Sequence, residues 1–271
     1  MLFARQIMTI QPVQTPLVQV VFYTTGDADF PICVQTQKKD FSPLDSLKKI
    51  GHSELSDRFN NLNNATDNHF ARTFKSEMQW SIASDYSWIN AHRVGKTWIE
   101  DVILIASAHP DTTCGKSIWS KVSDLGGCLI VDLDTRDACY DICANSIIYK
   151  PDWNEHYYGS DVARIDFSIW DDGYDIKVEK LDQLVQRLEQ AKQKTIWIHC
   201  YAGVGRTGSL ITAFLLKRLI QQKICTAENF AAQLDLLIFS LRKERHPQFV
   251  SSFHQYSMLF HYGLFLLESL S

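Results

Sequence analysis

Residues 195–209 constrain the fold of this chain more than any other part of its sequence. The run Thr195-Ile196-Trp197-Ile198 is apolar and rich in β-branched residues, which is typical of a buried strand. Two glycines follow at positions 203 and 205, and a helical repeat of apolar residues begins at Leu210. A tight loop between a strand and a helix N-terminus presents backbone N–H groups to an anion. The sequence therefore predicts an anion-binding loop at this place.

Reactive side chains accompany the predicted loop. Cys200 stands at its start, and backbone N–H groups near a helix N-terminus favour the thiolate form of a cysteine. Arg206 can hold two phosphate oxygens with its planar guanidinium, and Thr207 can offer a hydroxyl to the sulfur. A buried, unreactive cysteine beside a solvated arginine is the alternative, which the coincidence of all these residues disfavours. A Walker-type nucleotide loop is excluded because no Gly-Lys-Ser/Thr follows the glycines.

The segment from His199 to Gly208 resembles the signature loop of the cysteine-dependent protein tyrosine phosphatases, His-Cys-x5-Arg-Thr/Ser-Gly. The stretch from Ala202 onward is closer to the tyrosine-specific branch than to the dual-specificity branch. The resemblance implies a phosphatase-like α/β fold, a twisted mixed β-sheet flanked by α-helices. It also implies that His199 orients the loop and that Thr207 stabilises the departing thiolate. The residues implied to bind the phosphate are Tyr201, Ala202, Gly203, Val204, Gly205 and Arg206.

The stretch Ile165–Gly173 resembles the mobile Trp-Pro-Asp loop of the same family. Trp170 and Gly173 belong to this loop, Asp171 replaces its proline, and Asp172 falls on the position of the general acid. A carboxylic acid is needed because the tyrosyl oxygen must receive a proton when it leaves. An ordinary Asp-Asp-Gly turn is the alternative reading, and Asp171 competes for the role of the acid.

Near the C-terminus, Leu241–Arg245 and Phe249–Tyr256 resemble the glutamine-bearing loop and the last helix of the family. Its first glutamine orients the water that hydrolyses the thiophosphate, and Ser251 stands in that place here. Gln255 matches the second glutamine. We therefore expect Gln255 in the site and a slower second chemical step.

The amino-terminal half carries a third set of similarities. The segments Asp85–Ala91 and Trp98–Pro110 resemble two family segments, and the resemblance extends over roughly residues 50–268. Asn68-His69-Phe70 falls where the family has Asn-Arg-Tyr, a loop whose aromatic ring walls the phosphotyrosine pocket. Phe70 is thus expected to stack on the substrate ring, with Phe74 and Trp80 as alternatives for the same wall.

Composition narrows the class of protein further. The 271 residues carry a net charge of −4, with a pI near 6.1, which argues against a nucleic-acid partner. No apolar stretch reaches the length of a membrane span, and the first residues lack the apolar core of a signal peptide. Seven cysteines without paired spacing suggest free thiols in a reducing compartment. Cys139-x3-Cys143 has no second pair to complete a zinc site, so neither a metal nor an organic cofactor is expected.

Periodicity predicts strands followed mainly by helices. The expected strands are 17–22, 102–107, 128–133, 163–168 and 195–199. Apolar stripes predict helices around Leu181–Leu188, Leu210–Leu215 and Phe230–Leu241. Residues 41–64 are expected to form one or two short helices that start at Ser42-Pro43 and end in an Asn-rich stretch. No linker or repeat divides the chain, so residues 1–271 are expected to form a single domain, with 1–49 as its first part or as a short extension.

The resemblance implies a monomeric protein tyrosine phosphatase that acts on phosphotyrosine-containing proteins or peptides through a cysteinyl-phosphate. Two alternatives stay open at this point. A pseudophosphatase would bind phosphotyrosine without turnover, and a related enzyme would act on phosphoserine, phosphothreonine or an inositide. The expected location is the cytoplasm. The Gln- and Asn-rich amino-terminal part also favours a bacterial source, from which the enzyme could be secreted into a host cell.

Overall fold

The computed structural model describes residues 42–74, 91–108, 129–133, 147–149, 178–192 and 194–269. Contacts divide the chain between Phe41 and Ser42, and all described residues lie in the second unit, Ser42–Ser271. The expected strands at 17–22 and 163–168 lie outside the described residues. The organisation of residues 1–271 as one domain stays a prediction. Within the described ranges no helix is long and apolar enough to cross a membrane.

In the described part of the chain, five strands form one mixed sheet in the order β1-β2-β5-β3-β4. They are β1 (His92–Val94), β2 (Ile103–Ser107), β3 (Leu129–Asp132), β4 (Ile147–Tyr149) and β5 (Thr195–His199). Strand β1 is antiparallel to β2, and all other pairs are parallel. The apolar strand β5 is buried along its whole length, because it lies between β2 and β3. The predicted mixed α/β architecture is therefore confirmed.

Three of the predicted strands are found, and β1 and β4 are additional. Strands of three residues are too short to show an alternating pattern in the sequence, so periodicity could not reveal them. The predicted helical stripes correspond to α4 (Val178–Glu189), α5 (Gly205–Gln221) and α6 (Phe230–Glu244). The last helix, α7, spans Phe253–Ser269.

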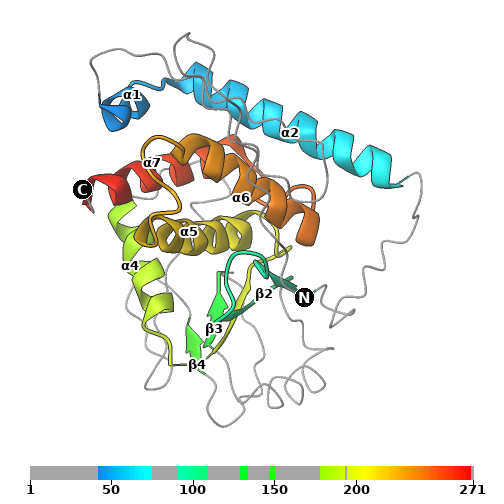
Figure 1. Ribbon diagram of the computed structural model, residues 1–271. Coiled ribbons are helices and arrows are strands. Elements are labelled where there is room, and N and C mark those ends of the chain that lie inside the picture. The colour runs from blue at the N-terminus through cyan, green and yellow to red at the C-terminus, as the bar shows by residue number, and fades with distance from the viewer. Residues whose placement is uncertain are drawn as a thin grey trace, which may run out of the picture. The chain divides into compact units, whose positions relative to one another are not determined.

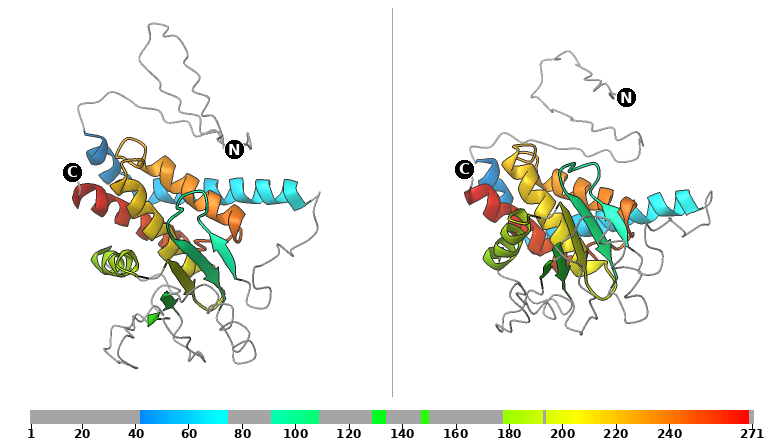
Figure 2. Two further views of the ribbon diagram at one scale, coloured as in Figure 1. Left: turned by 60° about the horizontal axis from the view of Figure 1, so that its bottom comes forward. Right: turned by 90° about the horizontal axis from the view of Figure 1, so that it is seen from below.

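The helices stack outward from the sheet. Helix α5 packs on β2 and β5, and α4, α6 and α7 pack around α5. Figure 1 shows α5 next to the strands and the long helix α2 (His52–Phe74) farther out, with α6 and α7 between them. In the view from below, the strands lie in front of the helices (Figure 2, right). Helix α5 is the most buried of these elements, which fixes its first turn relative to the end of β5.

The prediction for residues 41–64 is correct at its start and wrong at its end. Ser42 caps the short helix α1 (Pro43–Lys48), and its Oγ accepts a hydrogen bond from the backbone N–H of Asp45 at 3.1 Å. Helix α2 then continues through the asparagines to Phe74. The apolar face of α2 packs on α6 and α7, and this tertiary burial outweighs the weak helix propensity of asparagine.

A buried polar network joins three helices. Asp235 of α6 forms an ion pair with Arg58 of α2 and accepts a hydrogen bond from the hydroxyl of Tyr256 of α7 at 2.6 Å. Burial raises the pKa of Asp235, whereas the charge of Arg58 acts in the opposite direction. This network fixes α2 against the helices that carry the C-terminal part of the site.

Candidate active site

Cys200 follows directly on the carboxyl end of the central strand. Ligands of open α/β sheets bind at the carboxyl ends of the strands, which is where this thiol lies. Its side chain is only 3% exposed. Cys225, the other free cysteine in the described ranges, is also buried, and burial raises the pKa of its thiol to about 12. Cys225 thus stays protonated and unreactive near neutral pH.

Gly203 lies in close contact with the end of β2. Its φ is +68°, and a Cβ at this position would lie 2.1 Å from the carbonyl oxygen of Ser107. Ser107 is itself held, because its Oγ accepts from Trp197 Nε1 at 2.7 Å and donates to the carbonyl of Ala108 at 2.8 Å. Only glycine combines this backbone conformation with so close an approach. The loop is therefore fixed to the sheet at a defined point.

We expect Gly203→Ala to destabilise the protein and to displace the loop. The left-handed conformation alone costs about 1–2 kcal/mol, and the clash with Ser107 adds to it. Differential scanning calorimetry should show a midpoint at least about 4 °C lower. Gly51→Ala is the matched control, because a Cβ at Gly51 meets nothing within 4 Å. An equal change in both variants would contradict the role of the close approach.

Arg206 lies in the first turn of α5, and the residue is 7% exposed. Its Nη1 donates a hydrogen bond of 2.7 Å to the carbonyl of Leu133, just after β3. The N–H of Leu133 in turn donates to the carbonyl of His199 at 2.8 Å. The ends of β3 and β5 thus hold Arg206 beside the loop. A residue that is to clamp a phosphate must lie in this place. Thr207 is fully buried, and its hydroxyl has no hydrogen-bond partner among the described residues.

His199 is buried against an acid that sequence reasoning missed. Its Nδ1 lies 3.6 Å from Oδ1 of Asp132, and both side chains are at most 1% exposed. This separation is that of an electrostatic contact and is too long for a hydrogen bond. One signal for Asp132 was present in the sequence, because an apolar run ends there in an aspartate at the end of a buried strand. Functional groups of parallel sheets gather at the edge formed by the carboxyl ends of the strands.

Gln255 reaches the far end of the loop. Its Oε1 accepts hydrogen bonds from the backbone N–H of Ser251 at 2.9 Å and from the hydroxyl of Ser251 at 3.3 Å. A Cβ on Gly205 would lie 2.5 Å from Ser251 Oγ and 2.8 Å from Gln255 Nε2. Both residues therefore border the loop at Gly205, and the role of Gln255 in the reaction stays a prediction.

The segment before Ser251 is strained and firmly held. Val250 has a φ of +60°, which is rare for a β-branched residue. Two hydrogen bonds from Arg242 offset the strain of this backbone conformation. Its Nε donates to the carbonyl of Phe249 at 3.0 Å, and its Nη2 donates to the carbonyl of Val250 at 3.1 Å. The backbone of Val250 also abuts Gly208 of α5, where a Cβ would lie 2.7 Å from the valine nitrogen. The glutamine-bearing segment is thus pre-formed.

Tyr201 and Ala202 lie at the exposed mouth of the loop, and Tyr201 is 62% exposed. Gly203 is buried, and Val204 and Gly205 are intermediate. Val204 precedes α5 without a side-chain cap. The six predicted phosphate-binding residues are thus contiguous around Cys200, with a helix N-terminus among them.

The prediction that Phe70 lies in a loop is wrong. Asn68, His69 and Phe70 lie within helix α2 and not in a loop, so the expected loop is absent at these residues. The ring of His69 contacts that of Phe239 on α6, with 5.8 Å between ring centroids, and helix packing explains why no loop forms. The role of Phe70 as a pocket wall stays a prediction.

Several predicted site residues lie outside the described residues. They include the loop with Trp170, Asp171, Asp172 and Gly173, most of the segment 85–91, and Cys139 and Cys143. Their roles stay predictions. Within the described ranges no group of three or more metal-binding side chains occurs.

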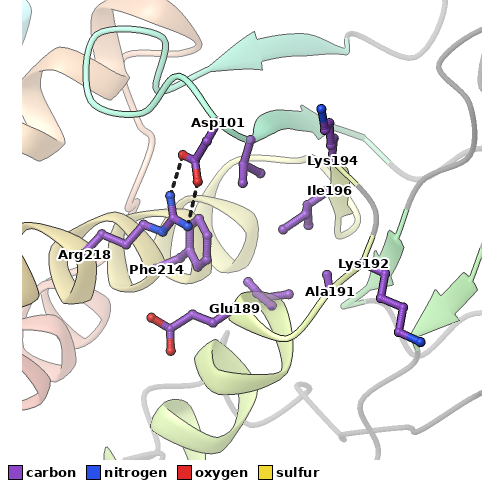
Figure 3. A pocket seen from close by; sticks show the side chains of 10 residues that line it. Asp101, Glu189, Ala191, Lys192, Lys194, Ile196, Phe214 and Arg218 are labelled. Carbon is purple, nitrogen blue, oxygen red and sulfur yellow. Dashed lines mark hydrogen bonds and ion pairs between the residues drawn. The ribbon is translucent and has the colours of Figure 1, made fainter.

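A separate pocket lies at the opposite end of the sheet (Figure 3). It is lined by Lys194 and Ile196 at the start of β5, whereas Cys200 follows the end of this strand. Arg218 and Asp101 form a two-bond ion pair at its edge, with N–O distances of 2.7 and 3.1 Å. This pocket is therefore not part of the loop site.

The fold and the site together define a class. A parallel strand, a cysteine, a glycine loop and an arginine in the next helix are the framework of a cysteine-based phosphatase. Residues 144–264 match the family described as "Dual specificity phosphatase, catalytic domain". Residues 144–264 are thus similar to a phosphatase catalytic domain, as the resemblance of residues 199–208 to the cysteine-dependent phosphatases implies.

Solved structures of the family share the fold. A Trypanosoma brucei protein tyrosine phosphatase matches with a TM-score of 0.56 at 15% identity, over 83% of this chain and 99% of its own. The catalytic domain of human protein tyrosine phosphatase non-receptor type 18 matches with a TM-score of 0.54 at 16% identity, over 85% and 100%. No curated protein sequence matches this chain. The predicted fold is thus confirmed.

Proposed function

We propose that this protein hydrolyses phosphotyrosine in proteins or peptides through a cysteinyl-phosphate intermediate. The observation that carries the proposal is the placement of Cys200, Arg206 and Gln255 around one loop at the end of β5. Structures of the non-receptor type 18 phosphatase in complex with HER2 phosphopeptides share this fold, with a TM-score of 0.52 at 14% identity over 83% of this chain and 98% of theirs. This likeness supports a phosphopeptide as the ligand.

In the first step the Cys200 thiolate attacks phosphorus in line with the leaving oxygen. The S–P bond forms while the P–O bond to the tyrosyl group breaks, and Asp172 donates the proton to that oxygen. Loop N–H groups and Arg206 hold the three other oxygens. In the second step Asp172 accepts a proton from water, which attacks phosphorus and releases the thiolate and phosphate. The buried hydroxyl of Thr207 can then donate to the thiolate sulfur.

Phosphoserine and phosphothreonine form the second candidate substrate class. The family match is to dual-specificity enzymes, and Asn68–Phe70 form no loop that could deepen the pocket. A direct comparison of phosphotyrosine, phosphoserine and phosphothreonine peptides of the same sequence tests the two proposals. We expect the largest kcat/KM for phosphotyrosine. Equal rates would establish dual specificity, binding without turnover would indicate a pseudophosphatase, and turnover of inositol phosphates alone would overturn both proposals.

We expect Asp172→Asn to reduce kcat for a phosphotyrosine peptide about 10²–10⁴-fold, because the poor leaving group then lacks its proton donor. An aryl phosphate with an activated leaving group needs little protonation and should lose far less. Single-turnover release of the phenol measures both reactions. Asp171→Asn is the matched control and should act normally. The reverse result would place the general acid one residue earlier.

A further inference from the structure

The side-chain amide of Gln255, in the first turn of α7, has one fixed orientation. Its Oε1 accepts hydrogen bonds from the backbone N–H of Ser251 at 2.9 Å and from the hydroxyl of Ser251 at 3.3 Å. A backbone N–H can only donate, so the amide must present its oxygen to Ser251. The amide nitrogen is then left for the loop. A Cβ on Gly205 would lie 2.8 Å from Nε2 and 3.1 Å from Oε1.

Gly205, the first residue of α5, leaves the room that this amide needs. Its φ does not lie in the left-handed region, so the backbone conformation alone does not require a glycine here. A Cβ at this position would also lie 2.5 Å from Ser251 Oγ, closer than packed atoms can approach. Space for Ser251 and Gln255 therefore explains the glycine. The amide thus lies directly against the turn that carries Arg206.

The backbone on both sides of Ser251 is held by hydrogen bonds. Arg242 donates to the carbonyl of Val250 at 3.1 Å, directly before Ser251. Directly after it, the Oγ of Ser252 accepts from the backbone N–H of Gln255 at 3.2 Å. Ser251 therefore keeps its two donors in place. A reversed amide of Gln255 would turn its own N–H groups toward them and would lose both hydrogen bonds.

The Nε2 group of Gln255 is a donor without a protein acceptor. It forms no hydrogen bond with any described residue and is not one of their fully enclosed polar atoms without a partner. The residue as a whole is only 4% exposed, so the remaining access is narrow. An oriented N–H donor that faces the first turn of a helix suits an anionic oxygen.

We propose that Ser251 is a positioning residue that fixes the amide of Gln255, so that Nε2 donates a hydrogen bond to a phosphoryl oxygen in the loop. The proposal rests on the proposed function, because it needs a phosphoryl group beside Cys200 and Arg206. The serine that stands at the place of the first glutamine of the family thus acts through the second glutamine.

Binding of inorganic phosphate, measured by isothermal titration calorimetry, tests the orientation of the amide without any turnover. Gln255→Ala loses one hydrogen bond to a charged group, so we expect the Kd to rise about tenfold. In Gln255→Glu the carboxylate still accepts from Ser251, but it has no donor near neutral pH and it repels the phosphate. The Kd should therefore rise further. A Gln255→Glu variant that binds phosphate as well as Gln255→Ala, or better, would overturn the proposal.

Gln233→Glu is the matched control for this charge. Gln233 is also 4% exposed, and it lies in the first turn of α6, at the opposite end of this helix from Arg242. The substitution should lower the thermal midpoint, because a charge is buried, and should leave the Kd for phosphate within about twofold. An equal loss of affinity in both glutamate variants would contradict a specific role of Gln255.

A double-mutant cycle tests whether Ser251 acts through Gln255. Ser251 is exposed, so Ser251→Ala should leave the thermal midpoint nearly unchanged. We expect it to raise the Kd for phosphate about threefold in the otherwise unsubstituted protein and to have no effect in Gln255→Ala. Ser252→Ala, which removes the neighbouring hydroxyl from the backbone of Gln255, should lower the thermal midpoint and leave the Kd unchanged. An equal effect of Ser251→Ala in both backgrounds, or none in either, would overturn the proposal.

A measurement on the unsubstituted side chain covers the case in which the Gln255 variants do not fold. The side-chain NH₂ resonances of Gln255 can be assigned from its backbone in the ¹⁵N- and ¹³C-labelled protein. Saturation with inorganic phosphate should move one of the two Nε2 protons downfield, and a spectrum without this change would overturn the proposal. If the change occurs but phosphotyrosine is not hydrolysed, only the proposed function is disproved.

Discussion

Cys200→Ser should abolish phosphatase turnover and leave the binding of inorganic phosphate nearly intact. Serine is a far weaker nucleophile near neutral pH, so kcat should fall roughly 10⁴-fold or more. The proposed anion cradle consists of backbone N–H groups and of Arg206, which Leu133 holds independently of the sulfur. Steady-state kinetics with a phosphotyrosine peptide measure the first effect. Isothermal titration calorimetry with phosphate measures the second, and we expect the Kd to change by less than about threefold.

Cys225→Ser is the control for this experiment. The thiol of Cys225 is 1% exposed, and its raised pKa of about 12 keeps it protonated. Its replacement should leave kcat within about twofold, although it can lower thermal stability because a hydroxyl is buried. Undiminished turnover of Cys200→Ser would refute a mechanism based on its thiolate.

Arg206→Lys should damage both binding and turnover. A lysine carries a point charge, so it cannot bond two phosphate oxygens side by side while it also donates to the carbonyl of Leu133. We expect kcat/KM to fall about 10²–10³-fold, the range typical for the loss of an oxyanion donor. Phosphate binding should weaken in the same titration that Cys200→Ser leaves unaffected. This contrast separates the clamp from the nucleophile.

Arg218→Lys offers a matched control on the same helix. Arg218 also forms two hydrogen bonds to one carboxylate, that of Asp101, but it lies at the edge of the separate pocket of Figure 3. Its substitution should change kcat/KM by less than about twofold. A large loss there, or none in Arg206→Lys, would contradict the assignment of the clamp.

The sequence was most informative where short-range geometry decides the structure. The loop around Gly203, the strand before it and the helix after it all follow from local spacing and turn chemistry, and the structure has them at the predicted residues. Ser42 was a correct start signal for the same reason.

Long-range packing decided what the sequence could not reveal. The continuation of α2 through its asparagines depends on α6 and α7, more than a hundred residues away. Asp132 stands at the end of an apolar run, but its contact with His199 depends on the pairing of β3 with β5, which joins residues 67 positions apart.

Arg242 connects a remote part of the chain to the segment that borders the candidate site. The guanidinium that supports Phe249 and Val250 also donates through Nη1 to Asn63 and Thr66 of α2, at 3.0 Å each. Arg242 lies 179 positions from Asn63 and 176 from Thr66, so one side chain joins two segments that are far apart in the sequence. Substitutions in the middle of α2 are consequently expected to act as second-site modifiers of defects in the glutamine-bearing segment. A genetic screen for suppressors should therefore include this helix as well as the signature loop.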